Sequence, residues 1–272
     1  MQYDPIKHSL GKVFNQSPTL RIFFYKLLDL LLLRSWYIRR ELKNQARNKP
    51  NEVNVLDAGS GFGQYDYYMS SLGPKWSITG VDVKEEQITD CNQFFSRIGK
   101  GDRVQFQKGD LTKFVQSEQY DLILSVDVME HILEDELVFR NFYASMKKGG
   151  TLLISTPSDQ GGSDTHEHDH DEVHGFIDEH VRDGYNAEDI TEKLFKAGFR
   201  NIETKYTYGR PGGLSWKLSM KYPILMLNRS KLFFVFIPFY YLLIYPVAYL
   251  LNVMDVRGKH EKGTGLMVTA YK

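Results

Sequence analysis

The sequence has one cysteine, no net charge and no internal repeat, and each of these absences excludes a class of protein. Cys91 is the single cysteine among 272 residues, so a scaffold held by internal disulfides is excluded. Basic residues number 34, as do acidic residues, so no basic footprint for nucleic acid is present. No low-complexity tract stands out. We expect a globular protein of a reducing cytosol, with Cys91 as a small helical residue rather than a nucleophile.

We do not expect the N-terminus to be a signal peptide. Its first apolar run begins at Leu20, which is late for a signal peptide, and charged residues interrupt it. Apolar residues recur there at helical spacing, which predicts helix over about residues 10–47. Four charged residues stand among them: Arg21, Lys26, Asp29 and Arg34. Because Lys49-Pro50-Asn51 then breaks the chain, we expect an N-terminal helical cap over residues 1–48.

The most informative segment reads VNVLDAGSGFGQY and begins at Val53. A short apolar strand ends at Asp57, and a turn rich in glycine follows. Glycine has no Cβ, so the backbone can bend sharply there and a ligand can approach it closely. The free N–H groups at the start of a following helix would face the same point. The next apolar run ends at Asp82, about 20 residues after the turn, where a carboxylate commonly binds ribose hydroxyls. The pattern predicts a nucleoside-containing cofactor.

Short apolar runs alternate with amphipathic segments over the rest of the chain. We predict strands at 53–57, 77–82, 103–107, 120–125, 150–155, 200–206 and 265–271. Helices are predicted at 63–72, 85–98, 134–147 and 187–198. This alternation predicts an α/β fold, with parallel strands covered by helices on both faces and one domain over residues 49–272.

Four segments resemble, in order and spacing, the motifs of the class I S-adenosylmethionine-dependent methyltransferases, a superfamily that includes the type 11 and UbiE-like enzymes. They are D-x-G-x-G-x-G at 57–63, the adenine-contacting segment at 108–111, the fourth strand at 120–127 and the fifth at 149–157. The resemblance covers about residues 53–199 and the final strand. It implies a Rossmann-like, mostly parallel sheet of seven strands with an antiparallel last strand, and S-adenosylmethionine as cofactor.

The resemblance also implies which residues bind the cofactor. Asp57 and the glycine turn would hold the methionine and ribose side, and Asp82 would accept the ribose hydroxyls. Asp110 would accept the adenine amino group, although such an acid also fits the simpler role of a local cap. The residues assigned are Asp57, Gly59, Ser60, Gly61, Gly63, Asp82, Val83, Asp110, Leu111, Ser125 and Asp127.

Candidates for acid–base chemistry follow the fourth strand. Glu130 and His131 lie where the resembled family places a methyl acceptor, and histidine takes up a proton near neutral pH. Ordering of the loop is the alternative role for His131. His180 is a further catalytic candidate, but its pairing with Arg182 resembles an H-x-R pair that pins a loop. An amine or carbanion acceptor would need no strong base.

The segment HEHDHDEVH carries residue types that bind metals. Its histidines are His166, His168, His170 and His174. Their spacing matches no known zinc site, so no metal is assigned. The default expectation is a solvated loop that closes over the pocket, with Gly161-Gly162 as its hinge.

An insertion over residues 209–262 separates the last two predicted strands. Its centre, 232–251, has no charged residue and is long enough to span a bilayer, although Pro238 and Pro246 argue against one straight helix. The last two strands of the resembled fold pair antiparallel, so a single crossing would leave them on opposite sides of the membrane. Basic residues on both flanks also indicate that both ends face the cytoplasm. We therefore predict a helical hairpin that lies on or dips into one leaflet, with a dimer arm or an apolar lid as alternatives.

Together these features predict methyl transfer from S-adenosylmethionine, by in-line displacement, to a small lipophilic acceptor such as a quinone, phenol, pigment or lipid. The protein would be cytoplasmic and peripheral at the inner face of the membrane. A non-catalytic Rossmann-like scaffold that assembles through the insertion, as a homodimer for example, is the alternative. An NAD-dependent oxidoreductase is weaker, because Gln64 replaces the third glycine of G-x-G-x-x-G. A Y-x-x-x-K at 143–147 also precedes the fifth strand instead of following it.

Overall fold

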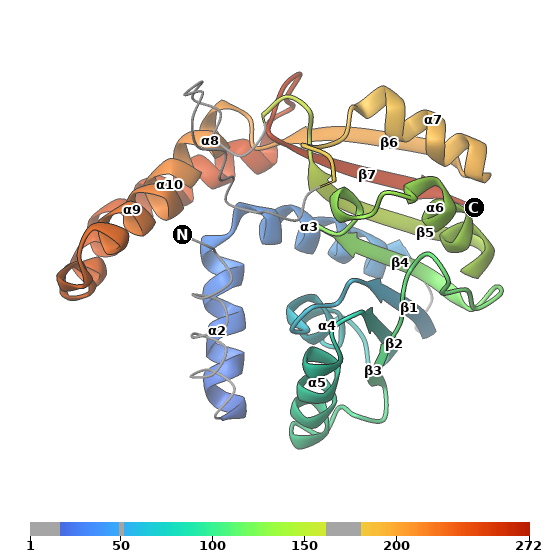
Figure 1. The fold of residues 1–272 in the computed structure, drawn as a ribbon. Coiled ribbons are helices and arrows are strands. Elements are labelled where there is room, and N and C mark those ends of the chain that lie inside the picture. Colours follow the sequence, from blue (N-terminus) through green and yellow to red (C-terminus); the bar gives the residue numbers. More distant parts are fainter. Residues whose placement is uncertain (1–16, 49–51, 162–180) are drawn as a thin grey trace.

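A computed structural model describes residues 17–48, 52–161 and 181–272. Within these ranges seven strands form one sheet in the order β3-β2-β1-β4-β5-β7-β6 (Figure 1). The strands are β1 (Glu52–Ala58), β2 (Lys75–Asp82), β3 (Val104–Lys108), β4 (Tyr120–Val126), β5 (Met146–Pro157), β6 (Arg200–Thr207) and β7 (Gly265–Tyr271). Strands β1 to β5 pair in parallel, whereas β7 is antiparallel to both β5 and β6. The predicted Rossmann-like sheet with an antiparallel last strand is confirmed.

Helices cover both faces of this sheet. They are α2 (Pro18–Leu31), α3 (Leu33–Asn48), α4 (Gln64–Met69), α5 (Glu85–Arg97), α6 (Asp135–Ser145) and α7 (Ala187–Ala197). In β1, Val55 and Leu56 point to opposite faces and are both fully buried. Val55 joins an apolar cluster with residues of α2, α3 and α5, and Leu56 joins a second cluster with residues of α6 and α7. Two-sided burial explains why the strands are continuous apolar runs rather than alternating ones.

The helix ends follow from local chemistry at α7 but not in the N-terminal segment. The Asn186 side chain accepts hydrogen bonds from the N–H groups of Glu188 and Asp189, and Gly198 ends α7 with a φ of +114°. The segment predicted to be helical over about 10–47 contains two helices in its described part, because extended backbone at Leu32 (ψ 111°) divides it into α2 and α3. The break turns α3 so that Ile38 and Leu42 are buried in the core beside the sheet. Tertiary packing thus overrides an uninterrupted local pattern.

The insertion forms a helical hairpin, here called the arm, over residues 210–257. It comprises α8 (Arg210–Trp216), the π-helix η2 (Lys217–Lys221), α9 (Tyr222–Arg229), the 3₁₀-helix η3 (Lys231–Val235) and α10 (Ile237–Arg257). Helix α10 returns along α8 and η2, and the arm projects from the sheet on the side where α2 lies (Figure 1). Residues 232–251 do not form one helix but are divided between η3 and α10. Pro238 lies in the first turn of α10, where its missing N–H is tolerated, and the helix continues through Pro246.

Buried polar contacts fix the base of the arm to α3. Asp255 is fully buried, and its Oδ1 accepts a hydrogen bond of 2.6 Å from the Tyr37 hydroxyl. Its Oδ2 accepts 2.8 Å from the Gly212 N–H, which joins α10 to α8. The arm leaves the sheet after Thr207 and returns at Gly265, and these two residues pair across β6 and β7. Since Pro157 at the end of β5 also pairs with Gly265, the arm grows from the edge of the sheet where the parallel strands end.

Candidate active site

The turn after β1 has a left-handed backbone that favours glycine. Gly59, Gly61 and Gly63 have φ values of +89°, +53° and +79°. A Cβ on Gly59 would lie 2.1 Å from Val128 Cγ2, so no larger residue fits there. The Gly59 N–H donates to the Val81 carbonyl at 2.8 Å, which holds the turn against the end of β2. The arrangement brings bare backbone to a sheet edge where α/β folds bind nucleotides.

Asp82 joins the glycine turn to the loop that follows β2. Its Oδ2 accepts 3.0 Å from the Gly61 N–H, and its Oδ1 accepts 2.9 Å from the Lys84 N–H. Asp82 pairs in register with Lys108 of β3, and the Gly109 N–H donates to the Asp82 carbonyl at 3.0 Å. Three of the acids assigned to the cofactor, Asp57, Asp82 and Asp110, therefore stand at or just after the ends of the adjacent strands β1, β2 and β3.

Asp110 makes the local contacts of a turn cap. It is exposed, and its Oδ1 accepts from the Thr112 N–H at 2.9 Å and from the Thr112 hydroxyl at 2.7 Å. These hydrogen bonds hold the pKa of Asp110 below its usual value. Beside it, Leu111 is buried in the core, and Val83 on the neighbouring loop is exposed. The assignment of Asp110, Leu111 and Val83 to the adenine stays a prediction.

Asp57 and Asp66 form a buried pair of carboxyl groups beneath the glycine turn. Asp57 ends β1 and Asp66 lies in the first turn of α4, and neither is more than 2% exposed. Burial raises the pKa of both groups, and each lies close enough to the other to titrate with it. The nearby Asp82 raises the pKa of Asp57 further. The pair is therefore most stable when it holds a proton.

Replacing Asp66 by asparagine is expected to flatten the dependence of stability on pH. An acid with a raised folded pKa stabilises the fold fully below its unfolded pKa of about 4, and this contribution is lost as pH rises through the folded pKa. Asparagine can donate to Asp57 without titrating. Between pH ~5.5 and ~8.5 we expect the melting temperature of Asp66→Asn to fall ~2–4 °C less than that of the wild type. Thermal melts with the exposed Asp102→Asn as control test this, and equal falls in all three proteins would contradict it.

Two buried hydroxyls at the strand ends fit a site that receives a polar ligand. The Ser60 and Ser125 side chains are at most 8% exposed, and their oxygens find no hydrogen-bond partner among the residues described. Buried polar groups without partners are rare in proteins and call for an explanation. Ser60 belongs to the glycine turn and Ser125 to the end of β4, where the resemblance assigns both to the cofactor. These residues fit a nucleoside cofactor that presents hydroxyl and amino groups.

The end of β4 forms the other side of the site. Asp127 has a φ of +50°, its N–H donates to the Ser155 carbonyl at 2.8 Å, and its carboxylate forms an ion pair with Arg34 of α3. Glu130 follows in the short helix η1 (Met129–His131), is 1% exposed and accepts 3.0 Å from the Thr156 hydroxyl. Burial raises the pKa of Glu130, while His131 and Arg34 oppose the rise. The end of β4 therefore carries Asp127, Glu130 and His131, with Arg34 beside Asp127, where the methyl acceptor was predicted to bind.

A network behind η1 fixes the loop that carries Glu130 and His131. Asp135 forms an ion pair with Arg182 and accepts 2.7 Å from the Tyr185 hydroxyl, while Arg182 also donates to the Ile132 carbonyl at 2.7 Å. Arg182 therefore pins this loop. The other residues predicted for the surrounding loops lie outside the described residues: His166, His168, His170, His174 and His180. The described part of the chain holds no cluster of histidine, cysteine and acidic residues with the geometry of a metal site.

Contacts from the N-terminal helices to the glycine turn were not predicted. Arg21 of α2 is 2% exposed and donates to the Phe62 carbonyl at 2.7 Å and to Asp90 of α5 at 2.5 Å. The Tyr25 hydroxyl donates to the same carbonyl at 2.5 Å. Arg21 also lies 3.2 Å from the sulfur of Cys91, whose pKa burial raises to about 12, as expected for a structural cysteine. The sequence signal that could have indicated these contacts is the set of charged residues within an otherwise apolar helix.

Gln64 explains the departure from the dinucleotide motif. Its Nε2 donates to Asp29 at 2.8 Å and to the Ser35 hydroxyl at 3.1 Å, so this side chain joins α4 to both N-terminal helices. A glycine there would lose both contacts. Gln64 therefore holds the N-terminal helices against α4, whereas the glycine of the dinucleotide motif packs the helix closely against the strand.

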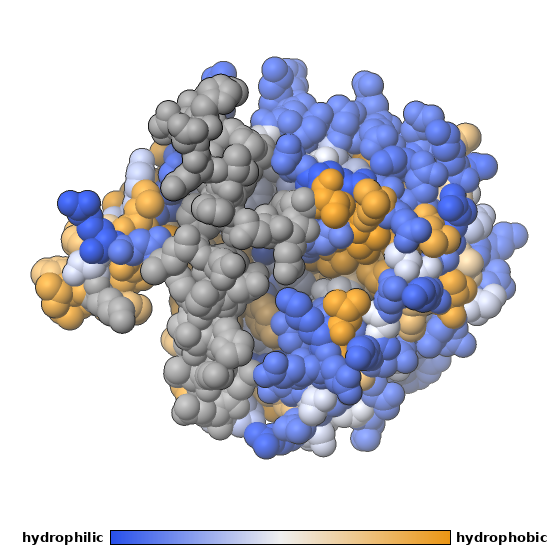
Figure 2. Space-filling model, in the orientation of Figure 1, coloured by the Kyte–Doolittle hydropathy of each residue, from blue (hydrophilic) through white to orange (hydrophobic). Residues whose placement is uncertain are grey.

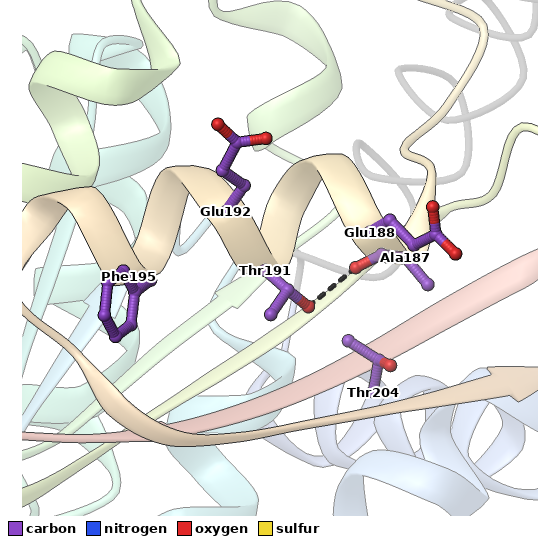
Figure 3. A pocket seen from close by; sticks show the side chains of 6 residues that line it. All are labelled: Ala187, Glu188, Thr191, Glu192, Phe195 and Thr204. Carbon is purple, nitrogen blue, oxygen red and sulfur yellow. Dashed lines mark hydrogen bonds between the residues drawn. The ribbon is translucent and has the colours of Figure 1, made fainter.

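A surface pocket lies far from these residues. It is lined by Ala187, Glu188, Thr191, Glu192, Phe195 and Thr204, between α7 and β6 (Figure 3). The Thr191 hydroxyl donates to the Ala187 carbonyl at 2.6 Å, so this group serves its own helix (Figure 3). Three strands separate β6 from β1, which at the usual spacing places the pocket about 19 Å from the glycine turn. We assign it no part in the site.

Comparisons with known proteins agree with this geometry. A family model described as a methyltransferase domain matches residues 49–201. The phosphoethanolamine N-methyltransferase of Triticum aestivum is 29% identical over 155 residues, which are 57% of this chain and 29% of that protein. The arsenite methyltransferase of Mus musculus is 32% identical over 111 residues, 37% of this chain and 30% of that protein. The chain spans less than a third of the length of these two relatives.

A solved structure shares the fold over most of the chain. The Haemonchus contortus phosphoethanolamine N-methyltransferase 2, in complex with phosphomonomethylethanolamine and S-adenosylhomocysteine, superposes with a TM-score of 0.60. The match covers 87% of this chain and 52% of that one at 19% sequence identity. At this identity the likeness concerns the arrangement of the elements alone.

Proposed function

The chain belongs to the methyltransferase-domain family, and on that premise we propose that it transfers the methyl group of S-adenosylmethionine to a small lipophilic acceptor. The glycine turn carries the proposal, since it holds backbone N–H groups and the Asp82 carboxylate side by side at the end of β1 and β2. A carboxylate there suits ribose hydroxyls, and the bare backbone suits the rest of a nucleoside.

S-adenosylmethionine supplies a methyl group on a sulfonium, which an acceptor displaces in line. The chain supplies position and exclusion of water. Asp57 and the glycine turn would orient the methionine side, and the Ser125 hydroxyl and Asp127 would bound it at the end of β4. Arg34 would keep the Asp127 carboxylate in one orientation. His131 would take a proton from a phenolic acceptor, with the buried Glu130 holding η1 in place.

The lipophilic character of the acceptor is supported by what surrounds the site. The arm grows from the same sheet edge as the glycine turn, and its base is bonded to α3 through Tyr37. The same helix α3 carries Arg34, which reaches Asp127. An acceptor that enters along the arm would arrive beside the charged end of β4. Phosphoethanolamine and arsenite, which appear in the names of the relatives, are polar acceptors and contrast with the lipophilic acceptor proposed here.

Calorimetry and product analysis test the two parts of the proposal separately. We expect micromolar binding of S-adenosylmethionine and of S-adenosylhomocysteine. With methyl-labelled cofactor and a total lipid extract in mixed micelles, we expect label in the organic phase, and a loss of this label in His131→Ala without weaker cofactor binding. Phosphoethanolamine and arsenite serve as water-soluble acceptors.

Each outcome decides between the alternatives. Label that enters phosphoethanolamine or arsenite but no lipid would leave methyl transfer standing and refute the lipophilic acceptor. Absence of cofactor binding, with a folded protein by circular dichroism, would instead favour a scaffold that assembles through the arm.

A further inference from the structure

Helix α10 presents one continuous apolar face to solvent. The side chains on this face are Phe239, Leu242, Leu243, Val247, Leu250 and Met254, which recur every three or four residues. Leu242 and Leu243 are each 74% exposed. By length and composition α10 could cross a membrane, yet only 11% of its most apolar window is buried in the protein. A core helix of a soluble protein would be mostly buried, so this face is without cover within the described chain.

The apolar surface continues around the tip of the arm. Leu232, Phe234, Val235 and Phe236 in and beside η3 are all more than half exposed. Apolar side chains are visible along the projecting arm in Figure 2, with strongly hydrophilic ones beside them. Exposed apolar surface of this extent on one element marks an interaction site rather than ordinary surface.

On the opposite side of α10, three hydroxyl groups of the arm are paired with backbone carbonyls of the arm itself. The Tyr240 hydroxyl donates to the Leu218 carbonyl at 2.7 Å, and the Tyr241 hydroxyl donates to the Ser219 carbonyl at 2.6 Å. Both carbonyls belong to the π-helix η2, whose wider turn leaves them available. The Ser215 hydroxyl donates to the Ala248 carbonyl at 3.1 Å in the same way. Such pairing is what a hairpin needs where water is scarce.

The charge of the arm is almost entirely of one sign, since Asp255, its one acidic residue, is buried at the base. From residue 204 to residue 254 the sequence has no acidic residue but six basic ones, although the whole chain is neutral. They are Lys205, Arg210, Lys217, Lys221, Arg229 and Lys231. Two copies of the arm brought together would both carry a net positive charge, which disfavours their association. A surface that is apolar inside and negative at its border is the better complement, and a bilayer with anionic headgroups has this structure.

We propose that the arm docks the protein on an anionic membrane surface, with the exposed face of α10 and the tip among the acyl chains of one leaflet. The hairpin lies along the interface and does not cross. Crossing would carry Lys217 and Lys221 through the hydrocarbon and leave Arg229 on the far side, against the usual distribution of positive charge. Both ends of the arm return to one sheet, which keeps the methyltransferase domain on the same side. The inference concerns binding and does not depend on the acceptor.

Vesicle flotation of the full-length protein tests the proposal. We expect it to float with phosphatidylcholine vesicles that contain about 30% phosphatidylglycerol, and less with phosphatidylcholine alone. The double variant Leu242→Ser/Leu243→Ser is expected to lose binding to the anionic vesicles at least ~10-fold, because two leucines no longer enter hydrocarbon. Arg229→Glu is expected to reduce binding to anionic vesicles alone. Phe195→Ser, at a similarly exposed apolar residue on α7, is the matched control and should float as the wild type does.

Two results would overturn the proposal. One is a wild type that stays with the soluble fraction for both vesicle types. The other is a wild-type dimer in sedimentation velocity that the double leucine variant converts to monomer, since a second copy would then cover the face. Circular dichroism establishes that each variant is folded, and cofactor calorimetry adds a second check for the variants of the arm and of α7. Asp82→Ala should float like the wild type whether or not methyl transfer occurs.

Discussion

Replacing Asp82 by alanine is expected to weaken binding of S-adenosylmethionine by about 100-fold or more, as measured by calorimetry. A hydrogen bond to a charged acceptor contributes about 1.5–3 kcal/mol, and the ribose of the cofactor offers two hydroxyls to this carboxylate. The variant would also release the N–H groups of Gly61 and Lys84, which Asp82 holds at 3.0 Å and 2.9 Å. The glycine turn would then lose its fixed position against β2, so the loss combines ligand contacts with preorganisation.

The neighbouring acids provide graded controls. Glu85 lies three residues further on, is exposed and pairs with Lys108 at 2.8 Å, so Glu85→Ala should bind the cofactor as the wild type does. Asp110→Ala should lose less than Asp82→Ala, because Asp110 is exposed and already bonded to Thr112. Binding by Asp82→Ala within threefold of the wild type would show that this carboxylate is not the ribose acceptor.

Arg21→Ala is expected to destabilise the fold by about 3 kcal/mol and to weaken cofactor binding as well. The Arg21 side chain is 3% exposed and that of Asp90 is 34% exposed, so the loss comes mainly from the buried hydrogen bonds that the guanidinium donates. Here the loss would reach Asp90, the Tyr25 hydroxyl and the Phe62 carbonyl, all of which Arg21 contacts. Since Phe62 lies within the glycine turn, α2 would hold the backbone that faces the cofactor only through the Tyr25 hydroxyl. Thermal melting should show a fall of roughly 8 °C.

Arg39 offers a matched comparison on the next helix. It also pairs with an aspartate, Asp29, at 2.5 Å, but its side chain is 38% exposed. Arg39→Ala should therefore cost no more than about 1 kcal/mol and leave cofactor affinity unchanged. Equal losses of stability and of cofactor affinity in the two variants would contradict the prediction that the burial of Arg21 and its contact with the glycine turn make it the more important residue.

The strands, their parallel order and the glycine turn could be predicted because their signals are local. A run such as 53–57 followed by Gly59, Gly61 and Gly63 carries its own conformational requirement, which the φ values confirm. The last two strands followed from the resemblance, and their antiparallel pairing is confirmed. The roles of Asp57, Asp82 and Ser125 toward the cofactor stay predictions, although the structure places these residues at one edge of the sheet.

The contacts that complete the site could not be predicted, because they join residues far apart in the chain. Arg21 meets Phe62 and Asp90, and Arg34 meets Asp127, through packing that no local spacing encodes. The division of α2 from α3 at Leu32 is of the same kind, since an apolar helical pattern runs through it without interruption. Pro246 shows the reverse case, in which a strong local breaker is absorbed by α10.

The pairing of Thr207 with Gly265 across β6 and β7 has an evolutionary consequence. Because the insertion begins and ends at two residues that pair with each other, the hairpin between them can be gained or lost without changing the register of any strand. The length of this one connection can therefore vary without disturbing the pairing of the strands that carry the glycine turn.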